Sequence, residues 1–264
     1  MQALVGTVSP WQDRIDRAAA LAGRQSWAAE VLTFYGHLAE RQRSIAEDAL
    51  STRPDAARLA AWIAARAIPS IVEVAVNHGP EKLAAGALAR FHEADLEVLV
   101  ATWLAGTQQA PIDSFLARAA AAPVLEALPD LAAATGLGSG DERHCPTCGG
   151  APQLSYFGIS GEDLVTAPRY LLCSRCSGSW VFPRLVCAGC GEVDSGRLII
   201  LADTERLPGL RIDACDTCRL YLFTVELPKI PGAVPLVDEL AALPLDLHAK
   251  ERGLKKVTPN LVGF

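Results

Sequence analysis

All eight cysteines of the chain occur in Cys-x-x-Cys pairs, and this spacing is the strongest chemical signal in the sequence. Two residues between cysteines allow a tight turn to aim both sulfurs at one ion, and backbone N–H groups of the turn can point at the sulfurs. Two such turns complete a tetrahedral shell of four thiolates, which suits zinc or a single iron ion. The predicted metal ligands are Cys145, Cys148, Cys173, Cys176, Cys187, Cys190, Cys215 and Cys218.

The four pairs are arranged as an internal repeat. Within each half of the repeat 24 residues separate the two pairs, 10 residues lie between the halves, and the unit recurs after 42 residues. Arg169 then corresponds to Arg211. Gly149 and Gly191 follow the first turn of each unit, where a left-handed backbone is often needed. We expect each repeat to close its own site, with closure across the two middle pairs as the alternative.

Other roles for paired cysteines fit this sequence less well. Four disulfides are disfavoured in a cytosolic chain, because reducing systems keep thiols open. A thioredoxin-like site needs one reactive pair in a βαβ setting, and a [4Fe–4S] ferredoxin needs tightly clustered cysteines. A four-thiolate shell has no open position, which disfavours metal-assisted hydrolysis. Two roles stay open for the metals: structural staples of a small β module, or reversible iron chemistry and electron transfer.

Residues outside the cysteine pairs give no convincing catalytic centre. His144 directly precedes Cys145 and is expected at the surface beside the turn, with a role as alternate ligand as the other possibility. His92 is expected on a solvated helix face. Arg169 and Arg211 either shield the thiolates or lie at the surface. The sequence has no Gly-x-Ser-x-Gly motif and no phosphate loop of accepted spacing. We therefore expect a protein that is not an enzyme.

The elements that would position the cysteines change character near residue 140. The first 140 residues hold 35 alanines and the rest of the chain 9, which favours a compact bundle of helices in the first part. Ser26 and Asp55 are expected to cap two helices, Pro69 to kink or end the second, and Pro80 to occupy a first helical turn. A fourth helix is expected over much of residues 112–128.

The cysteine-rich part has the pattern of short strands. Antiparallel strands are expected between the cysteine pairs, over residues 154–157, 170–172, 180–182, 198–201 and 220–225. A helix should follow over residues 236–252, and Pro244 argues against one straight helix there. The tail, residues 258–264, is expected to be extended.

The expected fold class is α+β, with an N-terminal helical bundle, two tandem zinc-ribbon-like β modules and a C-terminal helix. Glycines around Ser139 mark a flexible connection. The expected domains are the helical domain (1–140), the first four-cysteine module (141–186), the second four-cysteine module (187–228) and the C-terminal helix and tail (229–264).

Charge and hydropathy exclude several classes of partner. The chain has a formal net charge of −6, and residues 141–226 hold eight Arg, no Lys and eleven acidic residues. A phosphate polyanion would be repelled, so we expect no nucleic acid, and a protein partner fits the ribbon better. No apolar run reaches the ~18 residues of a membrane span, so no membrane insertion is expected. The first 25 residues lack a basic stretch followed by an apolar core, which favours a cytoplasmic location.

The motifs around the cysteines resemble those of the formate dehydrogenase accessory protein family, FdhE. The first repeat reads His144-Cys-Pro-Thr-Cys-Gly-Gly, then Arg169-Tyr-Leu-Leu-Cys-Ser-Arg-Cys with Trp180. The second reads Cys187-Ala-Gly-Cys-Gly, then Arg211-Ile-Asp-Ala-Cys-Asp-Thr-Cys. The string Val237-Asp-Glu-Leu-Ala-Ala-Leu-Pro-Leu-Asp-Leu is similar to the family's helix after the metal module. The resemblance covers residues 144–262, and the N-terminal helices match only in general character.

This resemblance implies a cytoplasmic bacterial protein that is needed to make active formate dehydrogenase. Such a maturation or accessory factor would bind the catalytic subunit of that enzyme before membrane export. The family's paired-cysteine sites are rubredoxin-like and associated with iron, so the resemblance implies two mononuclear iron sites, with zinc as the other metal. The alternative function is an iron-based redox or electron-transfer protein.

Overall fold

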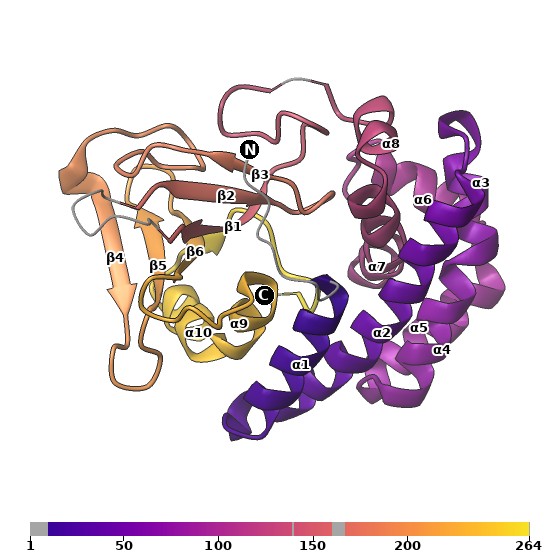
Figure 1. The fold of residues 1–264 in the computed structure, drawn as a ribbon, viewed down its shortest axis with the longest axis horizontal. Helices are drawn as coiled ribbons and strands as arrows, with labels where there is room; N and C mark the ends of the chain where they lie inside the picture. Colours follow the sequence, from indigo (N-terminus) through magenta and orange to yellow (C-terminus); the bar gives the residue numbers. More distant parts are fainter. Residues whose placement is uncertain (1–9, 139, 160–166, 264) are drawn as a thin grey trace.

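The computed structural model describes residues 10–138, 140–159 and 167–263, and it consists of a helical part and a sheet part (Figure 1). Helices α1–α8 form one side of the molecule, the sheet forms the other, and α9 and α10 cover one face of the sheet next to α1 (Figure 1). The predicted α+β class is confirmed. The predictions that involve Ser139 and Phe264 fall outside the described residues.

Short connections join the helices of the N-terminal part. Alanines at positions 119, 120 and 121 of the seventh helix are fully buried, and such small side chains allow neighbouring helices to approach closely. The elements are α1 (Pro10–Ala22), η1 (Ser26–Ala28), α2 (Ala29–Thr52), η2 (Ala56–Arg58), α3 (Leu59–Arg66), α4 (Ile68–His78), α5 (Glu81–Glu93), α6 (Leu96–Leu104), α7 (Pro111–Ala127) and α8 (Pro129–Ala134).

Most of the expected helix boundaries are confirmed. The Asp55 carboxylate accepts a hydrogen bond of 2.7 Å from the backbone N–H of Ala57 and so caps the turn that leads into α3. Pro69 lies in the first turn of α4, and α3 ends before it. The expectation for Ser26 is wrong, because this residue begins the 3-10 turn η1 and its side chain caps no helix. Helix α2 runs unbroken through Thr52.

One helical stretch of the N-terminal part is unusually apolar. Residues Ala56–His78 are long and apolar enough to cross a membrane by length and composition. Arg58, Arg66 and Glu73 interrupt this stretch, so it contains no continuous apolar run of that length. In the fold this stretch is divided into η2, α3 and α4, and Ile63, Ile68 and Ile71 lie fully buried in the helical core. Buried core helices can have this length and composition without crossing a membrane.

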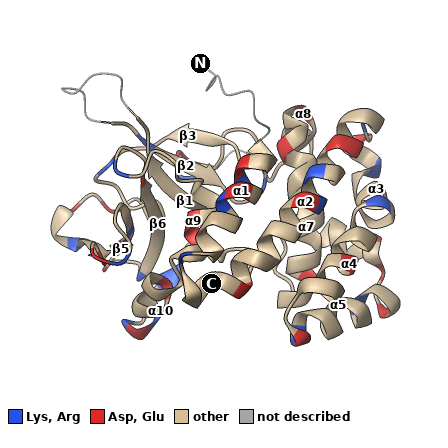
Figure 2. Ribbon diagram, turned by 60° about the horizontal axis from the view of Figure 1, so that its bottom comes forward, with Lys and Arg blue, Asp and Glu red and all other residues tan. Residues whose placement is uncertain are grey.

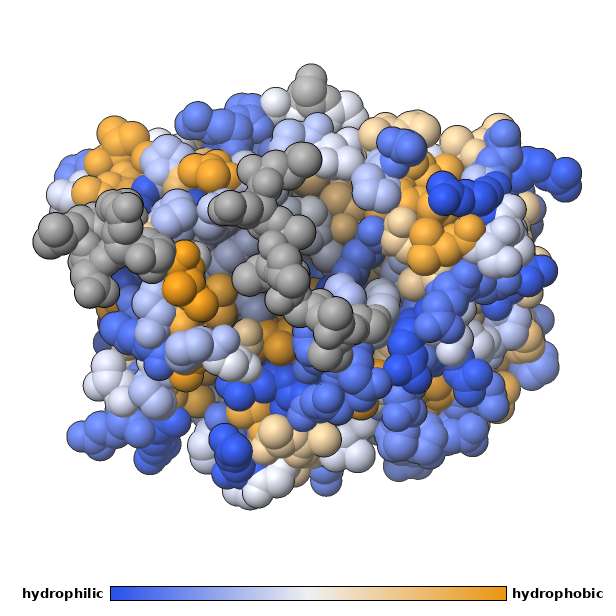
Figure 3. Space-filling model, viewed as in Figure 1, coloured by the Kyte–Doolittle hydropathy of each residue, from blue (hydrophilic) through white to orange (hydrophobic). Residues whose placement is uncertain are grey.

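Basic and acidic residues are interspersed along the helices (Figure 2). Several arginines are paired with acids, including Arg14 with Glu126 at 2.7 Å and Arg90 with Asp113 at 2.6 Å. On the face shown in Figure 3, hydrophobic residues form several separate patches, some over the sheet part and some over the helical part. This surface has the mixed charge that the composition predicts, and these pairs neutralise basic residues that a phosphate polyanion would need.

The described strands form a seven-stranded sheet in the order β3-β2-β1-β6-β5-β4, with β7 beside β6. Neighbours within each repeat are antiparallel, whereas β1 and β6 pair in parallel and join the two repeats in one sheet. The expectation of antiparallel strands is therefore wrong at this junction. The strands are β1 (Pro152–Phe157), β2 (Arg169–Cys173), β3 (Ser179–Val181), β4 (Leu198–Ala202), β5 (Leu210–Cys215), β6 (Leu220–Glu226) and β7 (Lys255–Lys256).

The two repeats lie side by side in the same orientation. Strands β1, β2 and β3 of the first repeat correspond to β4, β5 and β6 of the second, and β1 runs parallel to β6. Consequently β2 and β5 run in the same direction. Cys173 ends β2 and Cys215 ends β5, so both four-cysteine clusters lie at the same end of the sheet.

The C-terminal helix is divided as Pro244 predicts, into α9 (Pro235–Ala241) and α10 (Leu243–Glu251). Helix α9 packs on the N-terminal part, where the Arg17 guanidinium donates to the buried Asp238 carboxylate and the Trp27 indole donates to the Ala241 carbonyl. Residues of α1, α2 and α9 share one hydrophobic cluster. The division into four domains stays a prediction.

Candidate metal centres

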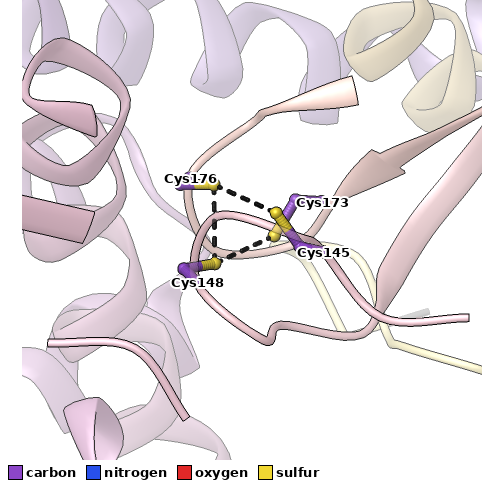
Figure 4. Close-up of side chains that lie close together, drawn as sticks. All are labelled: Cys145, Cys148, Cys173 and Cys176. Atoms are coloured by element: carbon purple, nitrogen blue, oxygen red, sulfur yellow. Dashed lines mark hydrogen bonds between the residues drawn. The ribbon is translucent and has the colours of Figure 1, made fainter. Parts of the chain in front are cut away.

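The eight cysteines are gathered into two clusters of four sulfurs. In the first cluster, Cys148 Sγ lies 3.4 Å from Cys173 Sγ and 3.5 Å from Cys176 Sγ, and Cys145 Sγ lies 3.7 Å from Cys176 Sγ (Figure 4). All four sulfurs point at a common centre between the two turns (Figure 4). Each cluster takes its cysteines from one repeat, which is the predicted grouping.

The second cluster repeats this geometry at the other module. Cys187 Sγ lies 3.8 Å from Cys218 Sγ, and Cys190 Sγ lies 3.8 Å from Cys215 Sγ. The four ligand atoms lie within 4.8 Å of one another, as they do in the first cluster. The two repeats thus present the same donor set twice.

These sulfur separations fit a metal ion and not a disulfide. Sulfurs about 2.3 Å from a central zinc ion form a tetrahedron with edges of about 3.8 Å, whereas a disulfide bond is about 2.05 Å long. The observed separations of 3.4–3.8 Å agree with the tetrahedron, and all eight cysteines are free. Both clusters can therefore hold a metal ion, and four thiolates would fill its shell.

Each metal-binding turn places one residue in a left-handed conformation. Gly149 and Gly191 have φ of 68° and 82°, as the sequence predicts, and their N–H groups donate to the carbonyls of Cys145 and Cys187. The second turns use Ser177 (φ 54°) and Arg219 (φ 60°) at the corresponding positions. Sequence reasoning missed these two residues because the signal it used was glycine.

The thiols within each cluster are not equivalent: the pKa values of Cys145 and Cys215 are lowered, whereas neighbouring sulfurs raise the pKa of Cys173 and burial raises that of Cys218. Hydrogen bonds from Cys148, Cys173 and Cys176 lower the pKa of the Cys145 thiol far below its ordinary value. In the second cluster, burial disfavours the Cys215 thiolate, but hydrogen bonds from the backbone N–H groups of Cys218 and Thr217, together with those from the Cys187 and Cys190 thiols, lower the pKa of Cys215. A metal ligand must be a thiolate, so the surroundings of Cys145 and Cys215 favour the ligand form.

The first cluster is part of the core that joins the sheet to the helical bundle. Its four cysteines are buried and belong to the same hydrophobic cluster as the buried residues of α2–α8. Arg175, between Cys173 and Cys176, donates to the carbonyls of Trp103 and Leu104 at 3.1 and 3.0 Å and lies over the Trp103 ring. These carbonyls end α6, where a cation is favourable. Arg175 was not predicted from the sequence, because the second repeat has no arginine at the corresponding position.

The second cluster lies at the surface and is contacted from the first module. Arg143, two residues before Cys145, donates to the Gly189 carbonyl inside the Cys187–Cys190 turn at 2.8 Å. Asp141 holds the Arg143 guanidinium through two of its nitrogens. This guanidinium is therefore a positive charge beside the thiolates of the second cluster, a role that the sequence did not reveal.

The two arginines singled out by the repeat converge on one acid instead. Arg169 is buried, donates to the Val186 carbonyl at 3.1 Å and lies 3.4 Å from the Asp213 carboxylate. Arg211 lies 2.9 Å from the same carboxylate. Neither arginine lies free at the surface, so the surface position, one of the two alternatives for these residues, is wrong. This group of two arginines and Asp213 joins β2 of the first repeat to β5 of the second and to the segment that precedes Cys187.

The two histidines lie where the surface interpretation places them. The side chain of His144 is part-exposed and its Nδ1 lies 3.0 Å from an Asp141 oxygen, outside both sulfur clusters. His92 is exposed on α5.

A cleft of about 1320 Å³ separates the helical bundle from the C-terminal tail, and the stacked rings of His37 and His78 line it. Arg175 also lines this cleft.

Comparison with known proteins finds similarity to FdhE proteins in both sequence and fold. Residues 185–262 match the family described as "FdhE, C-terminal domain". A "Protein FdhE homolog" from Aquifex aeolicus is 35% identical over 123 residues, which are 47% of this chain and 42% of that protein. A "Protein FdhE homolog" from Pseudomonas putida is 32% identical over 127 residues, which are 47% of this chain and 39% of that protein. The matches span less than half the length of these curated relatives.

The fold is shared over almost the whole chain with a solved structure. The crystal structure of the FdhE protein from Pseudomonas aeruginosa superposes on this chain with a TM-score of 0.70 at 22% sequence identity. The superposition covers 98% of this chain and 97% of the Pseudomonas aeruginosa chain. The resemblance predicted from the cysteine motifs is confirmed, and with it the combination of N-terminal helices with two four-cysteine clusters.

Proposed function

We propose that the chain, whose residues 185–262 match the C-terminal domain of the FdhE family, is a cytoplasmic maturation factor for formate dehydrogenase. It binds the catalytic subunit of that enzyme before export and acts by binding, not by catalysis. The observation that carries this proposal is the pair of four-sulfur clusters within the family motifs. Closed four-thiolate shells suit a binding protein better than a hydrolase.

The eight cysteines of the two clusters hold two mononuclear metal ions, and iron is the proposed metal. The sulfur separations support a four-coordinate ion at each site, and soft thiolates suit iron as well as zinc. Bound iron would supply a reversible one-electron couple. The protein supplies the thiolates and the backbone N–H groups that donate to them, such as those of Arg175 to Cys173 and Gly189 to Cys187, at 3.3 Å each.

The partner surface is the second metal module. Leu185 and Val193 flank its first turn and are each 68% exposed, and Ile200 on strand β4 is 60% exposed. Exposed apolar side chains beside a polar rim are typical of a protein-binding surface. The acidic charge of residues 141–226 repels nucleic acid and favours a protein partner.

Co-purification tests the proposal. A tagged chain should retain the formate dehydrogenase catalytic subunit, and Leu185→Asp with Val193→Asp should lose it while both metal ions stay bound. Val98→Asp is the matched control, since Val98 is a comparably exposed apolar residue on α6 of the helical part. Normal formate dehydrogenase activity in a strain that lacks this protein would contradict the proposal.

A further inference from the structure

The two clusters have the same donor atoms but opposite surroundings. The four cysteines of the first cluster are all buried, with exposed fractions of 1–7%. In the second cluster, Cys190 is exposed, Cys187 and Cys218 are part-exposed, and only Cys215 is buried. A repeat that is symmetric in sequence has therefore folded into one interior site and one surface site.

The interior position of the first cluster is fixed by contacts on several sides. The Leu137 N–H donates to the Cys148 carbonyl at 2.9 Å, and the Trp180 indole donates to the Glu142 carbonyl at 2.9 Å. The buried Arg175 ties the Cys173–Cys176 turn to the end of α6. The first cluster is therefore buried between the sheet and the helical bundle.

Among the described residues, the second cluster has less cover on the side of its first turn. Leu185 and Val193, on either side of the Cys187–Cys190 turn, are mostly exposed. A Cβ at Gly191 would meet no heavy atom within 4 Å, so the space next to this turn is open. Arg143 contacts the turn through a single hydrogen bond to the Gly189 carbonyl, and its side chain is 27% exposed.

From this asymmetry we propose that the second cluster exchanges its metal ion with thiolate or chelating ligands in solution, whereas the first cluster retains its ion. The inference rests on the metal-binding part of the proposed function. Exchange begins when an incoming donor forms a bond to the metal and the bond to Cys190 Sγ breaks. The released thiolate takes a proton from water, and the other three sulfurs follow in the same way. The ion keeps its oxidation state throughout.

Chelator competition tests this proposal on the full-length protein loaded with two zinc ions. With excess 4-(2-pyridylazo)resorcinol, one zinc should leave rapidly and the second at least about tenfold more slowly. Cys190→Ser should abolish the fast phase and keep the slow one. Release of both ions at one rate would overturn the exchange proposal alone. A folded chain that binds no zinc would overturn it together with the metal sites of the proposed function.

Arg175→Gln supplies the converse test. Loss of this tie to α6 should accelerate the slow phase about tenfold and leave the fast phase unchanged. Arg206→Gln is the matched control, because Arg206 is exposed and its ion-pair partner is Asp203. Acceleration of the fast phase by Arg175→Gln, or of the slow phase by Arg206→Gln, would contradict the assignment of the phases.

Alkylation of the unmutated protein is an independent test, because it needs no variant that could fail to fold. Iodoacetamide added to the zinc-loaded chain should modify Cys190 first, then the other cysteines of the second cluster, as mass spectrometry of the peptides would report. The cysteines of the first cluster should stay unmodified until the second cluster is fully labelled. Early labelling of Cys145 or Cys173 would overturn the proposal.

Discussion

At the scale of single residues, the first turn of each repeat depends on a left-handed glycine, but the two glycines meet different surroundings. A Cβ at Gly149 would lie 2.1 Å from the Gly138 carbonyl oxygen, whereas one at Gly191 would meet nothing within 4 Å. Both positions have positive φ, at 68° and 82°. Backbone strain acts at both sites, and a steric clash is added only at the first.

This difference predicts unequal effects of the same substitution. Gly191→Ala should lower the free energy of unfolding by ~1–2 kcal/mol, the cost of a left-handed residue with a Cβ. Gly149→Ala should cost clearly more, because Gly138 must move away as well. Urea unfolding of the two metal-loaded variants measures the difference. Equal destabilisation would mean that the contact between Gly149 and Gly138 is unimportant.

A second prediction concerns the arginines around Asp213. Arg169→Met leaves the Val186 carbonyl and part of the Asp213 carboxylate without a buried donor, and should destabilise the chain by about 3 kcal/mol. Arg211→Met should cost less, because the Arg211 side chain is 21% exposed and water can replace it. Thermal or urea unfolding compares the variants. A smaller effect at Arg169 than at Arg211 would contradict the role assigned to the buried cluster.

The candidate site was predictable at this scale because its chemistry is local in sequence. The spacing of Cys145 and Cys148, and of the other pairs, is enough to place the sulfurs and to anticipate the turn glycines. Arg143 and Arg175 could not be found in this way, since what each one contacts is decided by tertiary packing. Arg175 meets the end of α6, some 70 residues earlier in the chain.

At the scale of elements, the parallel pairing of β1 and β6 joins the two repeats. Leu154 on β1 is fully buried and pairs with Phe223 on β6. Ser155 and Thr224 hydroxyls form a buried hydrogen bond of 2.6 Å across the same pair of strands. The seam between the repeats therefore has both an apolar and a polar contact.

Leu154→Ala should consequently destabilise both modules together, by ~2–5 kcal/mol for a fully buried leucine. Val181→Ala on the edge strand β3 is the matched control, because Val181 is 66% exposed and should cost little. Hydrogen exchange should report loss of protection in β5 and β6 as well as in β1 and β2. Loss confined to the first repeat would show that the seam does not couple them.

Several elements were predictable, and those that were missed have identifiable causes. Runs such as residues 220–225 are apolar enough to mark strands, and prolines 69 and 244 mark helix breaks. Strand β5 was missed because Arg211 and Asp213 alternate with its buried residues, so that it contains no apolar run. Parallel pairing of β1 with β6 could not be predicted, since no short-range signal sets which strands meet between repeats.

At the scale of the whole molecule, buried tyrosines make the fold sensitive to alkali. Burial raises the pKa of Tyr35 in α2 and of Tyr221 in β6, and the Tyr221 hydroxyl donates to Asp246 at 2.8 Å. The pKa of each tyrosine is higher in the folded chain than its value of about 10 in the unfolded chain. Its burial therefore contributes to the free energy of unfolding below about pH 10, and this contribution is lost as the pH rises above that value. The free energy of unfolding should therefore fall as pH rises above 10.

Urea unfolding at a series of pH values checks this expectation. The free energy of unfolding should drop by about 1 kcal/mol or more for each buried tyrosine between about pH 9 and pH 11. Tyr221→Phe should be less stable at neutral pH but show a shallower decline in alkali. A decline equally steep in this variant would assign the alkaline sensitivity to other groups.

Metal binding also belongs to the whole molecule, because the two clusters differ in what they hold together. Loss of the first ion should loosen the sheet from the helical bundle, while loss of the second should affect the surface module. Binding energy at a structural thiolate site is folding energy, so Cys145→Ser should cost more stability than Cys187→Ser. Equal losses in the two variants, measured by thermal unfolding, would contradict the asymmetry.

The metal content of the anaerobically purified chain is the most direct test of the two-site account. Native mass spectrometry should find two metal ions bound to each folded chain, and one ion in the Cys187→Ser variant. Elemental analysis of the same samples identifies the metal as iron or zinc. A fully folded chain that carries no metal ion, or a Cys187→Ser variant that keeps both ions, would contradict the account.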